Sequence, residues 1–201
     1  MTQILRIDAS ANSTGASSKK LGDALIVKLQ MANPGVNITL RDLNEQPSFI
    51  DESWVKANLT PADERSNEQK ERLAFSDTLI DELQSADRIL LTTPMYNFSV
   101  PATLKAWIDM VCRAGISFQY TSEGPVGLLK NKPVDIIITT GGVPLQSPVD
   151  FVSDYLKQIF RFIGIDKVNI IAADQMAVDA DSSFKKATQQ IEDLKTLTAA
   201  A

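Results

Sequence analysis

Five short runs of aliphatic and β-branched residues recur along the chain, and Pro, Gly or Asn residues bound them, which is typical of β-strands. The runs cover residues 4–7, 36–40, 88–92, 134–139 and 168–171. Between them lie segments whose apolar side chains recur three and four positions apart, which is the spacing of one helix face. The pattern therefore predicts strands that alternate with helices.

Several of the predicted helices carry recognisable end signals. The first helix covers residues 18–31, and the second begins at Ser66, where Ser66 and Gln69 have the spacing of a capping box. Ser99 is the predicted N-cap of the third helix, and Pro101 falls in its first turn. These signals predict one helix after each of the first three strands, either directly or after an intervening loop.

The last two helices are predicted mainly from their apolar faces. The fourth follows Ser147, ends at Gly164, and has a face made of Phe151, Tyr155, Ile159 and Phe162. The fifth has a face made of Phe184, Ala187, Ile191 and Leu194. Both helices complete the alternation of strand and helix.

This alternation predicts an α/β fold, in which a doubly wound, five-stranded parallel sheet carries helices on both faces. We expect residues 1–201 to form a single domain, because a second domain in a chain of 201 residues would lack its own core. Ligands of such sheets bind beyond the carboxyl ends of the strands. The residues after the first, third and fourth strands are therefore the candidates for function.

Two segments, residues 42–65 and 112–132, are longer than plain connections and carry large apolar side chains. Phe49, Trp54, Ile116 and Phe118 either pack back on the domain or meet another chain. A monomer of this size rarely exposes so much apolar surface, so we expect a homodimer.

The composition excludes several kinds of chemistry. The chain has one cysteine and no histidine, which excludes a Ser-His-Asp triad, a Cys-His pair and a zinc site built from His or Cys. No metal is expected. The lone cysteine fits a reducing compartment, and the net charge of −5 argues against nucleic acid or an anionic membrane as partner. Arg6 and Asp8 interrupt the first apolar run, and no run approaches the length of a membrane span, so we expect a cytoplasmic protein.

The loop after the first strand, residues 10–18, combines five hydroxyl side chains with Gly15 just before a helix begins. Backbone N–H groups and the helix dipole at such a place favour an anion. The loop matches neither the Walker pattern nor the dinucleotide fingerprint, so it suits a single terminal phosphate held without metal. A plain Ser-rich cap that binds nothing is an equally good interpretation of these residues alone.

The loops after the third and fourth strands offer different groups. Met95, Tyr96 and Phe98 can form a flat, polarisable wall beside the amide of Asn97, although they could also fold back into the core. Gly141 and Gly142 allow a backbone to approach a ligand closely, although most such pairs are simple turns. A phosphate loop, an aromatic loop and an amide loop at one sheet end together suit flavin mononucleotide (FMN).

Residues 94–98 followed by 104–109 resemble the FMN-dependent NADH-azoreductases of the flavodoxin-like superfamily, which stand near the NAD(P)H:quinone oxidoreductases. The segments 113–121, 124–128 and 162–165 and the Gly pair match as well. The resemblance implies a sheet order 2-1-3-4-5, a homodimer, and Tyr120 and Phe162 close to the substrate face of the flavin. It also implies that FMN is held by Ser10, Ala16, Ser17, Ser18, Met95, Tyr96, Asn97, Phe98, Thr139, Thr140, Gly141 and Gly142.

The activity that the resemblance implies is an FMN-dependent NAD(P)H oxidoreductase, which reduces quinones by two electrons and cleaves aromatic azo bonds to amines by a ping-pong mechanism. Ala16 and Thr140 depart from the family pattern, which more often has Ser and Arg there. Both NADH and NADPH stay open as electron donors, and the natural acceptor is open between quinones and azo compounds. The alternatives are a flavodoxin-type electron carrier, which has no substrate slot, and a regulatory flavin or NAD sensor.

Overall fold

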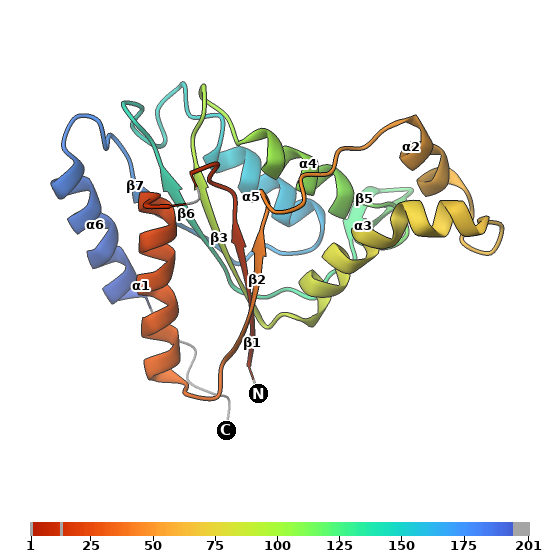
Figure 1. Ribbon diagram of the computed structural model, residues 1–201, viewed down its shortest axis with the longest axis horizontal. Coiled ribbons are helices and arrows are strands. Elements are labelled where there is room, and N and C mark those ends of the chain that lie inside the picture. Colours follow the sequence, from red (N-terminus) through yellow and green to blue (C-terminus); the bar gives the residue numbers. More distant parts are fainter. Residues whose placement is uncertain (1, 13, 195–201) are drawn as a thin grey trace.

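A five-stranded parallel sheet forms the centre of the molecule in the computed structural model, which describes residues 2–12 and 14–194 (Figure 1). The strand order is β2-β1-β3-β6-β7. The strands are β1 (Gln3–Asp8), β2 (Asn37–Asp42), β3 (Arg88–Pro94), β6 (Val134–Thr139) and β7 (Val168–Ala173). The two other strands, β4 (Phe118–Thr121) and β5 (Gly124–Gly127), form a separate hairpin, so the sheet has the predicted order 2-1-3-4-5. All five predicted strands are confirmed.

Helices cover both faces of the sheet, as predicted (Figure 1). The helices are α1 (Ser17–Ala32), α2 (Glu52–Leu59), α3 (Asn67–Ser85), α4 (Ala102–Val111), α5 (Ser153–Phe162) and α6 (Ala180–Asp193). One apolar core joins the sheet to α1 and α6, and a larger one joins it to α2, α3, α4 and α5. The sheet is therefore buried on both faces, and function must lie at its ends or edges.

The strands end level with one another at one edge of the sheet. Asp8 pairs in register with Asp42 on one side and Thr92 on the other, and Thr139 pairs with Pro94 and Ala173. The loops that follow these residues consequently share one end of the molecule.

The capping box at the start of the second predicted helix is confirmed at α3. The Ser66 side chain accepts a hydrogen bond from the Gln69 N–H, and the Gln69 side chain accepts one from the Ser66 N–H. The predicted N-cap of the third helix is wrong, because α4 begins at Ala102 with Pro101 as its cap. Ser99 instead exchanges two backbone hydrogen bonds with Tyr96 in a tight turn.

The fourth helix begins later than predicted. The Asp150 carboxylate accepts hydrogen bonds from the N–H groups of Val152 and Ser153, so α5 starts at Ser153 and Phe151 lies outside it. The buried face of α5 is Leu156 and Phe160, one position along from the predicted stripe. The predicted stripe is consequently left at or near the surface.

The predicted end of that helix at Gly164 is confirmed. Gly164 has a φ of 103°, and the Ile165 N–H donates to the Phe160 carbonyl while the Gly164 N–H donates to Arg161. Gly164 also lies against the backbone of Gly127 so closely that a Cβ on Gly127 would come within 2.0 Å of the Gly164 nitrogen. Both glycines are therefore needed where α5 meets the hairpin.

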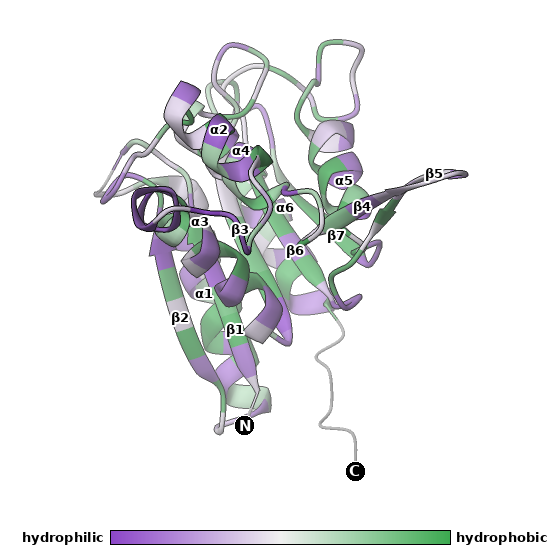
Figure 2. Ribbon diagram, turned by 90° about the vertical axis from the view of Figure 1, so that its right-hand side faces the viewer, coloured by the Kyte–Doolittle hydropathy of each residue, from purple (hydrophilic) through white to green (hydrophobic). Residues whose placement is uncertain are grey.

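The two long segments carry structure of their own. The first contains α2, and the second contains the hairpin of β4 (Phe118–Thr121) and β5 (Gly124–Gly127), which projects from the body of the molecule (Figure 2). Trp54 and Phe118 are buried within the chain, so the expectation that they expose apolar surface is wrong. Phe49 remains 58 % exposed. Across residues 2–12 and 14–194, no helix has the length and apolar character needed to cross a membrane.

Candidate functional site

A cavity of about 430 Å³ opens where β1, β3 and β6 end. Its lining includes most of the residues that the sequence predicted: Ser10, Ala16, Ser17, Ser18, Met95, Tyr96, Thr139, Thr140 and Gly141. Asn97, Phe98 and Gly142 continue the same loops but do not line it. The three predicted loops therefore do converge on one hollow.

Four lining residues were missed by the sequence analysis: Asn12, Pro94, Met176 and Ala177. Met176 and Ala177 belong to the loop between β7 and α6. No motif distinguishes them, but the sheet order could have found them, because β7 lies beside β6 and its loop must lie beside the Gly pair.

The first loop ends at the uncapped start of α1. Ala16 is the N-cap and offers no side-chain hydrogen bond, and the first turn contains no acidic residue. The Ser18 hydroxyl is buried and has no hydrogen-bond partner among the described residues. Unpaired helix N–H groups and an unpaired hydroxyl at one point form an anion site. Ser13, which also belongs to this loop, lies outside the described residues.

The lysine nearest this site is turned away from it. The Lys19 ammonium pairs with Asp42 at 2.5 Å, at the end of β2. Although partial burial opposes it, this contact lowers the pKa of Asp42 below its ordinary value. The anion site is consequently made of backbone and hydroxyl groups. No group of three His, Cys, Asp or Glu side chains comes together in the described part of the chain.

The second loop is a strained turn that exposes aromatic side chains. Tyr96 and Ser99 exchange two hydrogen bonds of 2.9 and 3.0 Å, and the two residues between them have positive φ values, 48° at Asn97 and 71° at Phe98. A bulky residue in this region is a genuine outlier, and such strain is concentrated at functional sites. Tyr96 and Phe98 are exposed and do not fold back into the core.

The third loop carries glycines that the fold itself does not require. Neither Gly141 nor Gly142 has a positive φ, and a Cβ built on either would meet nothing within 4 Å. Their lack of side chains leaves open space beside the cavity. The fold therefore leaves room for a ligand to approach the backbone here, and no positive φ requires either glycine.

The comparisons with known proteins agree with this geometry. The family model described as flavodoxin-like fold (Flavodoxin_2) matches residues 2–195. The chain belongs to this flavodoxin-like family. FMN-dependent NADH:quinone oxidoreductase 1 of Hahella chejuensis is 49 % identical over 191 residues, which cover 95 % of this chain and 94 % of that protein. The enzyme of the same name from Jannaschia sp. is 45 % identical, with coverage of 96 % and 99 %.

Solved structures of the flavodoxin-like fold are also similar. An FMN-dependent NADH-azoreductase from Bacillus anthracis, in complex with FMN, superposes with a TM-score of 0.86 at 25 % identity and covers 96 % of this chain and 97 % of that one. An azoreductase from Bacillus anthracis strain Sterne has a TM-score of 0.85 at 24 % identity, with 96 % of each chain covered. The latter likeness concerns the fold alone.

Tyr120 and Phe162 are not brought to the cavity of this flavodoxin-like chain. Their rings flank Phe118, at centroid distances of 5.4 Å for Tyr120 and 4.2 Å for Phe162. Phe162 ends α5 just before the chain enters the amino end of β7, whereas the cavity lies at the carboxyl ends. Tyr120 is 74 % exposed on the hairpin. One chain alone therefore does not place these two side chains at the site.

No charged side chain lines the cavity, since Asp, Glu, Lys and Arg are all absent from its lining. The one cysteine is unsuited to nucleophilic chemistry, since burial raises the pKa of the Cys112 thiol to about 12. The chemistry must come from a bound group, and the chain supplies hydroxyl, amide, aromatic and thioether contacts.

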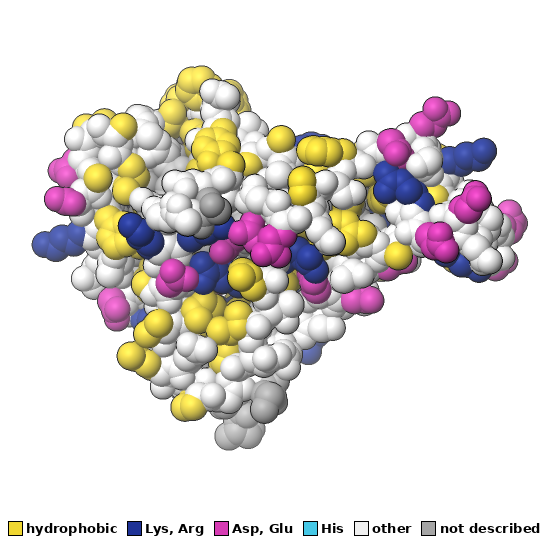
Figure 3. Space-filling view, viewed as in Figure 1, with side chains coloured by type: hydrophobic (Ala, Val, Ile, Leu, Met, Phe, Trp, Pro, Cys, Tyr) yellow, Lys and Arg dark blue, Asp and Glu magenta, His cyan; other side chains and the backbone are white. Residues whose placement is uncertain are grey.

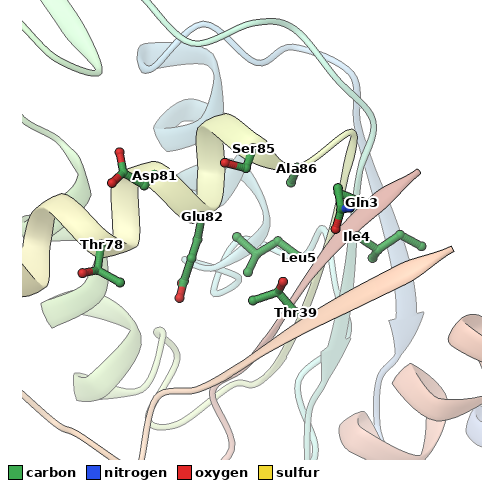
Figure 4. A pocket seen from close by; sticks show the side chains of 9 residues that line it. All are labelled: Gln3, Ile4, Leu5, Thr39, Thr78, Asp81, Glu82, Ser85 and Ala86. Carbon is green, nitrogen blue, oxygen red and sulfur yellow. The ribbon is translucent and has the colours of Figure 1, made fainter. Parts of the chain in front are cut away.

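A second cavity of about 290 Å³ lies near the amino ends of the strands, between α3 and β1 and β2 (Figure 4). Glu82 reaches from α3 toward Leu5 and Thr39 in this view, and its carboxylate pairs with Arg41. No residue of the three loops lines this cavity, and its Glu82 carboxylate is already engaged by Arg41 within the chain. The cavity at the carboxyl ends is therefore the candidate site.

Proposed function

We propose that this chain binds FMN in the cavity at the carboxyl ends and catalyses the NADH-dependent, two-electron reduction of quinones. The observation that carries the proposal is the arrangement of groups around this one cavity. The uncapped N-terminus of α1 and the unpartnered Ser18 hydroxyl lie at one side, and the open backbone of Gly141 lies at the other. The relatives named FMN-dependent NADH:quinone oxidoreductase, at 45–49 % identity over nearly the whole chain, support it.

The residues present fit FMN. The hydroxyls of Ser17 and Ser18 and the first N–H groups of α1 would hold the terminal phosphate, with Ser10 beside them. Met95 and Tyr96 would lie along the ring, and Gly141 would face its edge. When bound, FMN supplies the two-electron chemistry that no side chain of this cavity can perform.

The task left to the chain is orientation and electrostatics. Fixed N–H groups at Gly141 and Gly142 stabilise negative charge on the neighbouring ring edge without any reorganisation. No Asp, Glu, Lys or Arg side chain lines the cavity, so we infer that a proton for the acceptor comes from solvent. The side chains of Met95 and Tyr96 form a flat wall, which supports quinones and aromatic azo compounds as acceptors. These acceptors would use the same slot after the nucleotide has left, so the reaction would follow a ping-pong order.

We further propose that the active form is a homodimer. Tyr120 and Phe151 are exposed, and the partly buried Tyr155, Ile159 and Phe162 leave apolar area on α5 outside the core. Hydrophobic side chains also gather along the upper edge of the molecule, where the loops at the carboxyl ends lie (Figure 3). A second copy would cover this surface and could bring its own Tyr120 and Phe162 to the site. A monomeric mass in light scattering at micromolar concentration would contradict this.

The test of the function begins with the purified protein, which we expect to be yellow. Released flavin should be FMN without adenine, and steady-state oxidation of NADH should depend on added quinone. NADPH in place of NADH settles the donor, and an azo dye tests the second acceptor class. An FMN protein that barely turns over with any acceptor would be an electron carrier, and the proposal would fail. A single cysteine suits a reducing compartment, so we propose that the protein acts in the cytoplasm.

A further inference from the structure

The loop between β7 and α6 is bonded to the backbone of the Gly pair. The Met176 N–H donates to the Thr140 carbonyl at 2.9 Å, and the Ala177 N–H donates to the Gly141 carbonyl at 2.8 Å. The Gln175 N–H donates to the Thr140 hydroxyl at 2.9 Å. Three successive N–H groups of one loop therefore hold two successive residues of the other.

These bonds fix the direction of the N–H groups of Gly141, which lines the cavity, and of Gly142, which follows it in the same loop. The described chain has no cis peptide bonds, and in a trans peptide the carbonyl and the next N–H point in opposite directions. With the carbonyls of Thr140 and Gly141 turned toward the loop after β7, the N–H groups of Gly141 and Gly142 turn away from it. In the sheet order β1-β3-β6-β7, away from β7 means toward the loops after β1 and β3, which form the rest of the cavity.

Neither of these N–H groups has an acceptor within the described chain. The orientation is thus maintained while the donors stay free for a ligand. Gln175 contributes to it at a cost, since its φ of 60° lies in the left-handed region. Asp174, the first residue after β7, adds a further tie between the two loops, because its carboxylate accepts from the Leu145 N–H at 2.9 Å.

The Thr140 side chain is the centre of this connection. It is 3 % exposed, and its hydroxyl accepts from the Gln175 N–H and donates to the Val143 carbonyl. Both hydrogen-bonding roles of the hydroxyl are therefore used inside the chain, and none is left for a bound molecule. This position is one of those that the resemblance assigned to the cofactor, yet the hydroxyl faces the neighbouring loop.

We propose that Thr140 is a positioning residue, whose hydroxyl ties the loop after β6 to the loop after β7 and so keeps the Gly141 and Gly142 N–H groups aimed at the bound ligand. The assignment rests on the proposed function, in which that ligand is the ring edge of FMN. Thr140 contacts the two loops and acts on the cofactor only through the glycine amides.

The test compares three variants in FMN titrations of the full-length apoprotein and in the reduction potential of the bound flavin. Thr140→Val removes the hydroxyl at nearly constant volume, and Thr140→Ser restores it. Thr188→Val is the matched control, because the Thr188 hydroxyl donates to the Phe184 carbonyl on α6, away from the cavity. Thr140→Ala replaces the valine variant if that variant does not fold.

We expect Thr140→Val to bind FMN at least about tenfold more weakly and to lower the flavin potential, since the donors lose their aim. Thr140→Ser should stay close to the unmodified protein, and Thr188→Val should change only the thermal midpoint. A Thr140→Val protein with a lower thermal midpoint but unchanged FMN affinity and potential would overturn the positioning role. If the unmodified protein binds no FMN, the proposed function fails first and this assignment fails with it.

Discussion

Replacement of Gly141 by valine separates a ligand-contacting glycine from a turn glycine. In the free chain a Cβ at this position meets nothing within 4 Å, and the residue has no positive φ, so the substitution should cost the fold little. The added carbons would project into a cavity of about 430 Å³ that the flavin must share. We therefore expect FMN affinity to fall while the thermal midpoint of the apoprotein barely moves.

The expected size of the kinetic effect follows from the role of one fixed donor. Valine keeps the backbone N–H, but its side chain would displace the ring from that donor. Loss of the interaction with one preorganised N–H aimed at developing charge costs about 2.7–4 kcal/mol, which slows the step about 10²–10³-fold. Anaerobic stopped-flow measurement of flavin reduction by NADH gives this rate, and an FMN titration gives the affinity. Gly35→Val is the matched control, because Gly35 is exposed and lies between α1 and β2, remote from the cavity. A Gly141→Val protein with a lowered midpoint and unchanged FMN affinity would refute the reasoning.

Three further substitutions test other parts of the structure. Phe98→Gly should raise the free energy of unfolding of the apoprotein by about 1 kcal/mol in denaturant titrations, because glycine adopts the φ of 71° without strain; a decrease would show that the ring makes contacts that outweigh the strain. Lys132→Met should lower the free energy of unfolding by about 1–3 kcal/mol in the same titration, since the buried ammonium donates to the Leu83, Gln84 and Ala86 carbonyls at the end of α3. Lys130 is exposed, so Lys130→Met should leave this free energy almost unchanged. Hydrogen bonds from Ser53 and Trp54 and the nearby Arg72 lower the pKa of Asp51 from 3.8 to about 2. The stability that its carboxylate gives is therefore fully present above the ordinary pKa of 3.8 and is lost as the pH falls through about 2. Asp51→Asn should remove that part of the acid dependence of the thermal midpoint, and an unchanged acid profile would contradict it.

The central strands β3 and β6 were predictable because their residues are buried on both faces. Residues 134–139 and 88–92 are runs with no polar period, and only the centre of a covered parallel sheet accepts such runs. Helix starts were predictable where a side chain caps the helix, as at Ser66. Helix starts were mispredicted where the N-cap residue forms no side-chain hydrogen bond. Pro101 caps α4 without such a bond, and the start of α5 is set by the carboxylate of Asp150.

The three loops of the site that follow β1, β3 and β6 were predictable from the sequence, but the loop between β7 and α6 was not. The residues after β1, β3 and β6 carry compositions that differ from ordinary turns, whereas Met176 and Ala177 contribute mainly through their backbone and position. The sequence also could not predict that the Thr140 hydroxyl faces the loop after β7, since a threonine hydroxyl can bond a ligand or a neighbouring loop equally well. Those contacts are set by tertiary structure and leave no local pattern in the sequence.

The wall formed by the loop after β7 has a consequence for biosynthesis. Chains emerge from the ribosome with the amino terminus first, and the loop that offers the anion site, near Ser18, is among the first segments made. Met176 and Ala177, which orient the amides on the opposite side, are made near the end. A nascent chain that stops before Val168 thus already holds all three predicted loops but lacks the strand and loop that align them. We therefore expect a chain that ends before Val168 to hold FMN poorly, because it lacks the hydrogen bonds that align the Gly141 and Gly142 N–H groups.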